Sequence, residues 1–203
     1  MVVLPSNVRL VLASASPRRR QILQDRGYQF ELADPGEVEE SISHAPTPEQ
    51  LAIEKARVKA EAVAAKLHGP RPALVIGVDT LCAEGDRIIG KPLDRADAIA
   101  ILTRLAGTRH RVISGLCVQP VLKDGAGAPL LRAETTWVTM RRVPREEIEA
   151  YVATGEADGK AGAYAVQENG DKFVEKIEGS FLNVVGFPLE MFERELPLLL
   201  KTL

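Results

Sequence analysis

The sequence contains few of the residues that hold small or secreted proteins together. It has only 2 cysteines and 3 histidines among 203 residues. Cys82 and Cys117 lie inside apolar runs without C-x-x-C spacing, and the histidines are scattered. We therefore expect neither a disulfide framework nor a zinc site. A chain of this length buries about 70% of its unfolded surface and folds without such staples.

Aromatic residues, excess charge and long apolar runs are also scarce. Aromatics make up 4% of the chain, and 26 Lys and Arg residues face 28 Asp and Glu residues, for a net charge of -2. No stretch approaches the ~20 apolar residues of a membrane span, and residues 1–5 lack the basic region and apolar core of a signal peptide. We therefore expect no nucleic-acid partner, no membrane association and a cytoplasmic address.

Two common catalytic motifs are absent from the sequence. It has no G-x-x-x-x-G-K-[ST] loop and no G-x-S-x-G nucleophile elbow. P-loop and α/β-hydrolase chemistry are therefore excluded.

Strand-like and helix-like patterns alternate along the chain. The first helix is predicted to begin at Pro17, with Ser16 as its N-cap, and to end at Gly27. Asp94 is predicted to cap another helix that Gly107 ends. The other predicted helices cover residues 48–67, 144–152 and 188–200. Predicted strands cover residues 8–13, 30–33, 73–82, 87–92, 111–122, 130–143, 163–166, 172–177 and 183–185. This order predicts one α/β domain over residues 1–203: a mixed twisted sheet with helices packed around it and a cleft.

The first candidate site follows the first predicted strand, in the segment Ser14-Ala15-Ser16-Pro17-Arg18-Arg19-Arg20. Arginines in the first turn of a helix face the positive end of its dipole, which disfavours them by ~0.3–1 kcal/mol each. Backbone N–H groups, serine hydroxyls and guanidinium groups together bind phosphate well. The segment therefore indicates a phosphate site, or equally an exposed helix whose arginines pair with surface carboxylates.

The second candidate site is acidic. Asp79 and Thr80 lie in an apolar, strand-like run, where a carboxylate is costly unless it is paired or binds a metal. Residues 37–41 carry three glutamates, including Glu40. A carboxylate from each segment is typical of a site for Mg²⁺. The alternatives are a structural Asp at a strand end and a solvated charge run.

Three further polar residues are candidates for substrate contacts. Lys91 stands between Gly90 and Pro92, which restrict the backbone and so aim its charge. Lys55 lies on the flank of a predicted helix, where lysines are mostly solvated. Gln167 ends a Gly-rich segment, and its side-chain amide suits recognition of a base edge.

Several short motifs together resemble the Maf family of nucleoside triphosphate pyrophosphatases. They are S-A-S-P-R-R (14–19), E-E-S (39–41), E-K-A (54–56), G-V-D-T (77–80), G-K-P (90–92), K-A-G-A-Y-A-V-Q (160–167) and G-S-F-L-N-V-V-G-F-P-L (179–189). Each motif alone is weak, but their number and order are specific. The resemblance implies a fold like that of Maf proteins and inosine triphosphatases. It also implies hydrolysis between the α- and β-phosphates, giving a nucleoside monophosphate and pyrophosphate, with Mg²⁺ or Mn²⁺ as cofactor.

The resemblance also implies roles for individual residues. Asp79 matches the acceptor of the attacking water's proton, and Glu40, or the adjacent Glu39, matches a glutamate that places the metal. The match to the branch that acts on dTTP and UTP, rather than 7-methyl-GTP, depends on Arg18, Thr80 and Gln167. The residues that match substrate-binding positions are Ser14, Ser16, Arg18, Arg19, Lys55, Thr80, Lys91 and Gln167.

The chain departs from the family at one position that bears on the base-binding segment. Gly159 stands where many members have Asp, so no carboxylate role is assigned there.

The resemblance further implies a homodimer, a role in removing unwanted nucleotides and a link to arrest of cell division. The alternative hypothesis is a non-catalytic protein that binds nucleotide and regulates septum formation.

Overall fold

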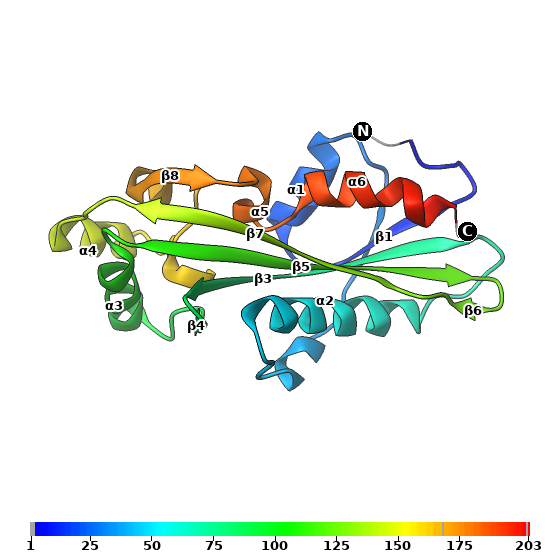
Figure 1. The fold of residues 1–203 in the computed structure, drawn as a ribbon, viewed down its shortest axis with the longest axis horizontal. Coiled ribbons are helices and arrows are strands. Elements are labelled where there is room, and N and C mark those ends of the chain that lie inside the picture. Colours follow the sequence, from blue (N-terminus) through cyan, green and yellow to red (C-terminus); the bar gives the residue numbers. More distant parts are fainter. Residues whose placement is uncertain (1–2, 168, 202) are drawn as a thin grey trace. The chain divides into compact units, whose positions relative to one another are not determined.

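The computed structural model describes residues 3–167, 169–201 and 203 (Figure 1). Met1, Val2, Glu168 and Thr202 lie outside the described residues. The chain divides into two compact units: residues 1–79, 114–134 and 186–203 form unit 1, and residues 80–113 and 135–185 form unit 2. Within the described ranges, no helix combines the length and the apolar character that crossing a membrane requires.

The strands form a mixed sheet. They are β1 (Arg9–Ala13), β2 (Glu31–Ala33), β3 (Ala73–Glu84), β4 (Arg87–Ile89), β5 (Arg109–Leu122), β6 (Gly125–Ala126), β7 (Leu130–Met140) and β8 (Val174–Glu178). Their hydrogen-bonded order is β2-β1-β3-β5-β7-β8, with β4 on β3 and β6 on β5. β1 pairs in parallel with β2 and β3, whereas β4, β6 and β8 pair antiparallel with their neighbours. The predicted mixed α/β fold is thereby confirmed. Three long strands continue from one unit into the other: β3 (Ala73–Glu84), β5 (Arg109–Leu122) and β7 (Leu130–Met140).

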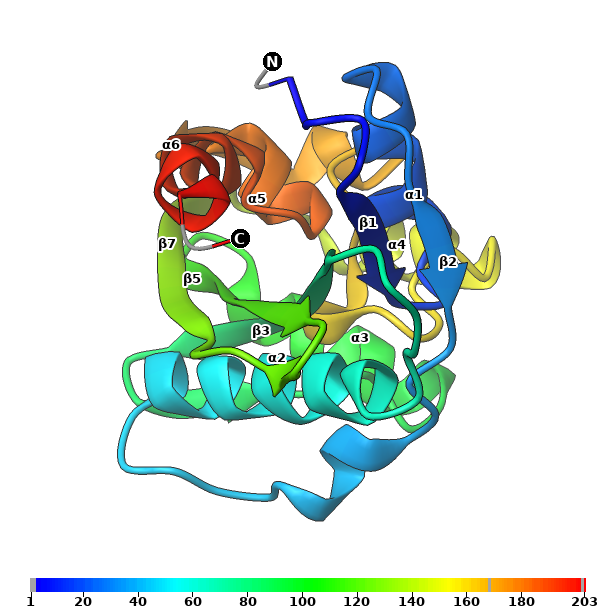
Figure 2. The ribbon, with the colours of Figure 1, turned by 90° about the vertical axis from the view of Figure 1, so that its right-hand side faces the viewer.

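Unit 1 packs helices on both faces of its part of the sheet. Its own elements are β1 (Arg9–Ala13), α1 (Pro17–Asp25), β2 (Glu31–Ala33), η1 (Val38–Ser41), α2 (Pro48–Ala64), β6 (Gly125–Ala126) and α6 (Leu189–Leu200). α2 covers one face, and α1 and α6 cover the opposite face (Figure 2). Small and β-branched side chains fill the space between α2 and the strands; they include Ala56, Ala60 and Val63 of α2 and Val11 and Val75 of the sheet.

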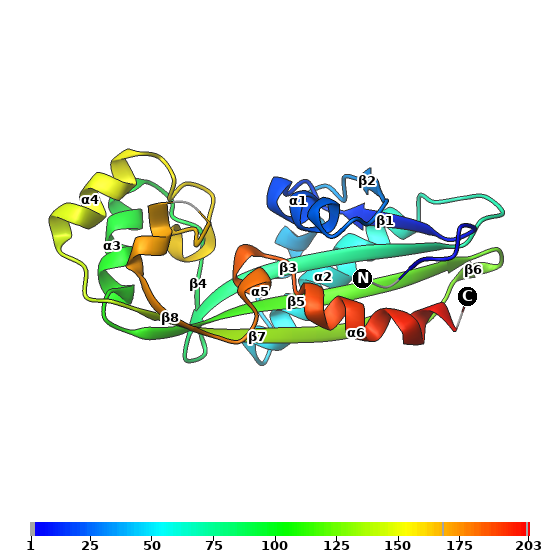
Figure 3. The same ribbon diagram turned by 90° about the horizontal axis from the view of Figure 1, so that it is seen from above.

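Unit 2 contains a pair of helices and several short elements. These are β4 (Arg87–Ile89), α3 (Arg95–Leu105), α4 (Arg145–Ala153), η2 (Ala161–Ala163), η3 (Asn169–Phe173), β8 (Val174–Glu178) and α5 (Phe181–Val185). α3 packs against both α4 and η2, and Figure 3 shows α3 and α4 side by side.

The predicted helix ends are confirmed where a local side chain or a glycine sets them. The Ser16 hydroxyl accepts a hydrogen bond from the Arg19 backbone N–H, and the Asp94 carboxylate accepts one from the Asp97 N–H. Gly27 and Gly107 have φ angles of 84° and 72°, in the left-handed region that glycine adopts most easily.

Two predicted strands are wrong. Residues 163–166 begin in a 3-10 turn, in which Gly162 and Ala163 both have positive φ, so the chain cannot extend there. Residues 183–185 belong to the short helix α5, because the Ser180 hydroxyl accepts the backbone N–H of Asn183 as an N-cap does. The predicted second helix is confirmed but ends at Ala64 rather than near residue 67.

Two glycines allow α2 to approach the sheet at backbone distance. A Cβ atom on Gly77 of β3 would lie 2.1 Å from the Ala56 carbonyl oxygen, and one on Gly115 of β5 would lie 2.1 Å from that of Ala52. Real Cβ atoms do not come so close to backbone atoms. Glycine at these two positions therefore sets how closely α2 packs on β3 and β5.

We expect Gly115→Ala to lower the free energy of unfolding by at least about 2 kcal/mol, because the added methyl group would push α2 away from β5. Chemical denaturation measures the change. Gly90→Ala is the control: a Cβ at Gly90 meets nothing within 4 Å, so its stability should equal or slightly exceed that of the wild type. Equal stability of the two variants would contradict the close packing of α2.

Candidate active site

The segment between β1 and α1 folds its polar groups around one arginine. The Ser14 hydroxyl accepts hydrogen bonds from the Ser16 backbone N–H, at 3.2 Å, and from Nη1 of Arg19, at 3.1 Å. Nε of Arg19 donates to the Gly186 carbonyl oxygen at 2.9 Å. The Arg19 guanidinium group is therefore held against the turn instead of extending into solvent.

The charges around Arg19 connect this turn with the acidic residues of unit 1. Burial lowers the pKa of Arg19 from its ordinary value, while the negative charges of Asp79 and Glu39 act in the opposite direction. The nearby positive charge of Arg18 lowers the pKa further. Two predicted substrate-binding arginines and two carboxylates thus share one electrostatic environment within unit 1.

The first turn of α1 offers a favourable place for an anion. α1 has nine residues, and none in its first turn is acidic. Arg18 is half-buried, and Arg20 is exposed. Because the helix dipole is positive at this end, an anion there would be favoured by both the dipole and the arginines. A phosphate role for this turn stays a prediction.

A buried lysine joins the two acidic segments. Nζ of Lys59 lies 2.7 Å from Oδ1 of Asp79 and 2.8 Å from Oε1 of Glu39. The Lys59 side chain is only 8% exposed, because it lies on the buried face of α2 between Ala56 and Ala60. The same face of α2 contacts Gly77, two residues before Asp79. The packing of α2 on β3 therefore brings lysine and carboxylate together.

The sequence reasoning missed Lys59 and favoured neighbouring residues. Lys55, the predicted lysine, is half-buried one turn earlier on α2, and Glu40, the predicted glutamate, is exposed. Lys59 contacts both Asp79 and Glu39, while substrate binding by Lys55 and metal binding by Glu40 stay predictions. A signal for Lys59 existed in the sequence: it follows Ala56 by three residues and precedes Val63 by four, so it lies on the apolar face of the helix.

The donor set of unit 1 fits a hard divalent cation. Asp79 and Glu39 approach the same ammonium group, so both can approach one cation. Mg²⁺ is commonly bound by one or two carboxylates together with substrate phosphates. Within the part of the chain that the structure describes, no group of three or more His, Cys, Asp or Glu side chains is placed to hold a metal.

The remaining predicted residues belong to unit 2. Thr80 is half-buried in β3, and Lys91 is exposed just after β4. Gln167 is exposed at the end of the segment that begins with η2. The backbone N–H of Gly162 donates to the carbonyl oxygen of Gly90 at 3.2 Å. This bond joins the segment that carries Gln167 to the residue before Lys91.

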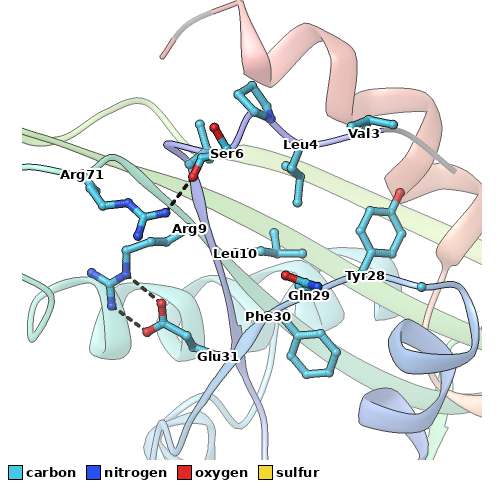
Figure 4. A pocket seen from close by; sticks show the side chains of 13 residues that line it. Val3, Leu4, Ser6, Arg9, Leu10, Tyr28, Gln29, Phe30, Glu31 and Arg71 are labelled. Carbon is cyan, nitrogen blue, oxygen red and sulfur yellow. Dashed lines mark hydrogen bonds and ion pairs between the residues drawn. The ribbon is translucent and has the colours of Figure 1, made fainter.

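A separate pocket of about 470 Å³ lies in unit 1, at the start of β1. Its charged groups are already bonded within the unit (Figure 4). Arg9 makes two hydrogen bonds to the Glu31 carboxylate, at 2.8 and 2.7 Å, and Arg71 donates to the Ser6 carbonyl oxygen at 2.8 Å. Since Ser14 follows the other end of β1, this pocket is not part of the candidate active site.

Comparison with known proteins finds a matching family and several similar proteins. The signature of the family described as "Maf-like protein" matches residues 9–198. The chain is 43% identical to a protein of Geotalea uraniireducens, covering 89% of each chain, and 44% identical to one of Thermococcus gammatolerans, covering 90% and 92%. Both relatives are named dTTP/UTP pyrophosphatase. A solved HAM1 protein from Coxiella burnetii is 18% identical, with a TM-score of 0.42, over 96% of this chain and 98% of that one.

We expect Lys59→Met to lower the free energy of unfolding at neutral pH by about 1–3 kcal/mol, because it leaves two partly buried carboxylates without their shared cation. Lys55→Met, one turn earlier on the same helix, is the matched control and should change stability by less than about 0.5 kcal/mol. Urea denaturation of both variants measures the difference. If Lys59→Met proved as stable as the wild type, the ion pair would contribute nothing to the fold.

Proposed function

The chain belongs to the family of Maf-like proteins, and we propose on this premise that it hydrolyses dTTP and UTP. Cleavage falls between the α- and β-phosphates and gives a nucleoside monophosphate and pyrophosphate. The observation that carries the proposal is the identity of 43–44%, over about 90% of the chain, with relatives named for this activity. The arrangement of charges in unit 1 supports it independently.

The residues of unit 1 suit the charge distribution of a triphosphate. Arg18 and Arg19, together with the positive end of the α1 dipole, are proposed to bind phosphate oxygens. The fixed position of Arg19, on the Ser14 hydroxyl and the Gly186 carbonyl, means that little side-chain entropy is lost when phosphate binds. Lys55 is proposed to add positive charge around the same group. Lys91, which belongs to unit 2, is proposed as a further substrate-binding lysine.

Asp79 is proposed to accept the proton of the attacking water. A general base needs a carboxylate held in one orientation within hydrogen-bond reach of the water. The bond from Lys59 to Oδ1 holds Asp79 in this way, and Oδ2 is the oxygen proposed to accept the proton. Phosphoryl transfer depends mainly on such positioning and on charge neutralisation.

A divalent cation is proposed to be held by Asp79 and by a glutamate of η1. Glu39 is the better placed glutamate, because it shares Lys59 with Asp79; the adjacent Glu40 is the alternative. When bound, Mg²⁺ or Mn²⁺ would neutralise charge on the phosphate oxygens. The ammonium group of Lys59 bonds to both carboxylates and offsets one of their two negative charges.

The first test is pyrophosphate release from dTTP, UTP, CTP, GTP and 7-methyl-GTP, with Mg²⁺, Mn²⁺ or EDTA. We expect metal-dependent turnover, greatest with dTTP and UTP. Asp79→Asn should lower kcat by about 10²–10⁴ because it removes the general base. Asp25→Asn, an exposed carboxylate on α1, is the control and should keep wild-type turnover.

Two results would contradict the proposal in different ways. Near wild-type turnover by Asp79→Asn would remove Asp79 from the mechanism. Nucleotide binding without any turnover at sub-stoichiometric protein would favour the alternative, a regulatory nucleotide-binding protein.

Base preference has its own test, at Arg18. The related branch that acts on 7-methyl-GTP typically carries Trp at this position. We expect Arg18→Trp to lower kcat/KM for UTP relative to 7-methyl-GTP by about tenfold, a size typical of a change in pocket contacts. Arg20→Trp, on the exposed side of the same helix turn, should leave that ratio unchanged. A substrate profile of Arg18→Trp equal to that of the wild type would contradict the role of Arg18 in base choice.

A further inference from the structure

A buried hydrogen bond anchors the segment that carries Gln167. Tyr164, three residues before Gln167, places its hydroxyl 2.7 Å from Nε2 of His110 on β5. The two rings meet edge to face, with centroids 5.6 Å apart and an interplanar angle of 87°. His110 is completely buried, and Tyr164 is 7% exposed. Both residues belong to unit 2.

The two polar groups depend on each other. Burial lowers the pKa of His110 to about 4 and raises the pKa of Tyr164 well above its usual value, so both side chains are neutral near pH 7. Among the described residues, Nδ1 of His110 has no hydrogen-bond partner. The bond to Tyr164 is therefore the one that satisfies the imidazole, whichever group carries the shared proton. Loss of either partner leaves the other buried and unsatisfied.

The backbone next to Tyr164 is restrained as well. Gly162 has a φ of 76°, and a Cβ atom there would lie 3.1 Å from Sγ of Cys82. Its N–H donates to Gly90, as described above. At the end of the segment, the Glu156 carboxylate accepts hydrogen bonds from the backbone N–H of Asn169, at 3.1 Å, and from its side-chain amide. Hydrogen bonds thus hold the backbone at Gly162, before Gln167, and at Asn169, after it.

A carboxylate therefore does act in this segment, although Gly159 replaces the Asp that many family members carry. Glu156 closes the segment by bonding to Asn169. The bond between Glu156 and Asn169 holds the backbone after Gln167, and the bond between His110 and Tyr164 holds the backbone before it.

We propose that His110 is a positioning residue for base recognition, which acts through Tyr164 by fixing the segment that carries Gln167. This inference rests on the proposed function and on the prediction from the sequence that Gln167 contacts the base. A glutamine amide bonds to N3–H and O4 of uracil in one orientation and, when turned over, to N3 and N4–H₂ of cytosine. It distinguishes the two bases only if the segment that carries it is held so that one of these orientations is favoured. A segment without its anchor binds pyrimidine more weakly and penalises the wrong base less.

The decisive variant is Tyr164→Phe, which removes one hydroxyl and keeps the ring. We expect KM for UTP to rise about tenfold and the ratio of kcat/KM for UTP to that for CTP to fall about tenfold, with kcat for UTP changing less than about threefold. His110→Leu should give the same pattern, and the double variant should be no worse than either single one, because both remove one bond. His110→Gln, which can still bond to the Tyr164 hydroxyl, should recover part of the ratio.

Ile148→Val is the matched control. Ile148 is buried in α4 of the same unit and makes no hydrogen bond through its side chain. Its substitution should lower the Tm of the protein while the UTP to CTP ratio stays at the wild-type value. If His110→Leu fails to fold, the test is the comparison of Tyr164→Phe with Ile148→Val in KM and in the UTP to CTP ratio.

The outcomes separate this inference from the proposed function. An active wild type, with Tyr164→Phe unchanged in KM and in the UTP to CTP ratio, would overturn the role of His110 and leave the proposed function intact. A uniform loss of kcat for every base, in step with Tm and shared by Ile148→Val, would also overturn it by showing a merely structural role. A wild type that releases no pyrophosphate from any nucleotide would instead overturn the proposed function, and this inference with it.

Discussion

The close contact between α2 and the sheet is the constraint on which the candidate active site depends. It requires glycine at Gly77 and Gly115, where a side chain would collide with the carbonyl oxygens of the helix. At this separation the buried face of α2 directs Lys59 toward Asp79, two residues beyond Gly77 on the same strand. A wider spacing would leave the lysine without a partner in the interior, at a cost of several kcal/mol. Packing and electrostatics therefore select the same geometry.

The side chains of Lys59 and Arg19 have polar or charged partners before any ligand arrives. Lys59 is shared by two carboxylates, and Arg19 is bonded to a hydroxyl and a carbonyl while it lies in the field of Asp79 and Glu39. A triphosphate bound with a divalent cation would add both negative and positive charge to this group, and Asp79 and Glu39 are the carboxylates that would hold the cation. Such an arrangement keeps the free protein stable and still leaves the arginines and the start of α1 able to meet phosphate.

Unit 2 holds in place a loop that has little regular secondary structure. The segment that ends at Gln167 has almost no strand or helix of its own, so its backbone bonds must be made elsewhere. Three bonds hold it: the Gly162 N–H donates to the Gly90 carbonyl oxygen, the Asn169 N–H just beyond the segment donates to the Glu156 carboxylate, and the Tyr164 hydroxyl bonds to the His110 ring. Gly90 and His110 are distant from Gln167 in sequence, so the position of this loop depends on the folding of unit 2.

The sequence by itself determined what depends on a few neighbouring residues. Ser16 and Asp94 as helix caps, Gly27 and Gly107 as helix ends, and the alternation of strands and helices all followed from local backbone chemistry, and the combination of short motifs identified the family. Tertiary structure decided which charged residues meet. Lys59 rather than Lys55 contacts Asp79, and Glu39 rather than Glu40 shares that lysine, because the rotation of α2 and the approach of η1 select among adjacent residues of equal charge. It also decided that residues 163–166 form no strand, since Gly162 and Ala163 adopt a turn that distant partners hold in place. Local patterns carry no information on such contacts, because their energy comes from groups that only the folded chain brings together.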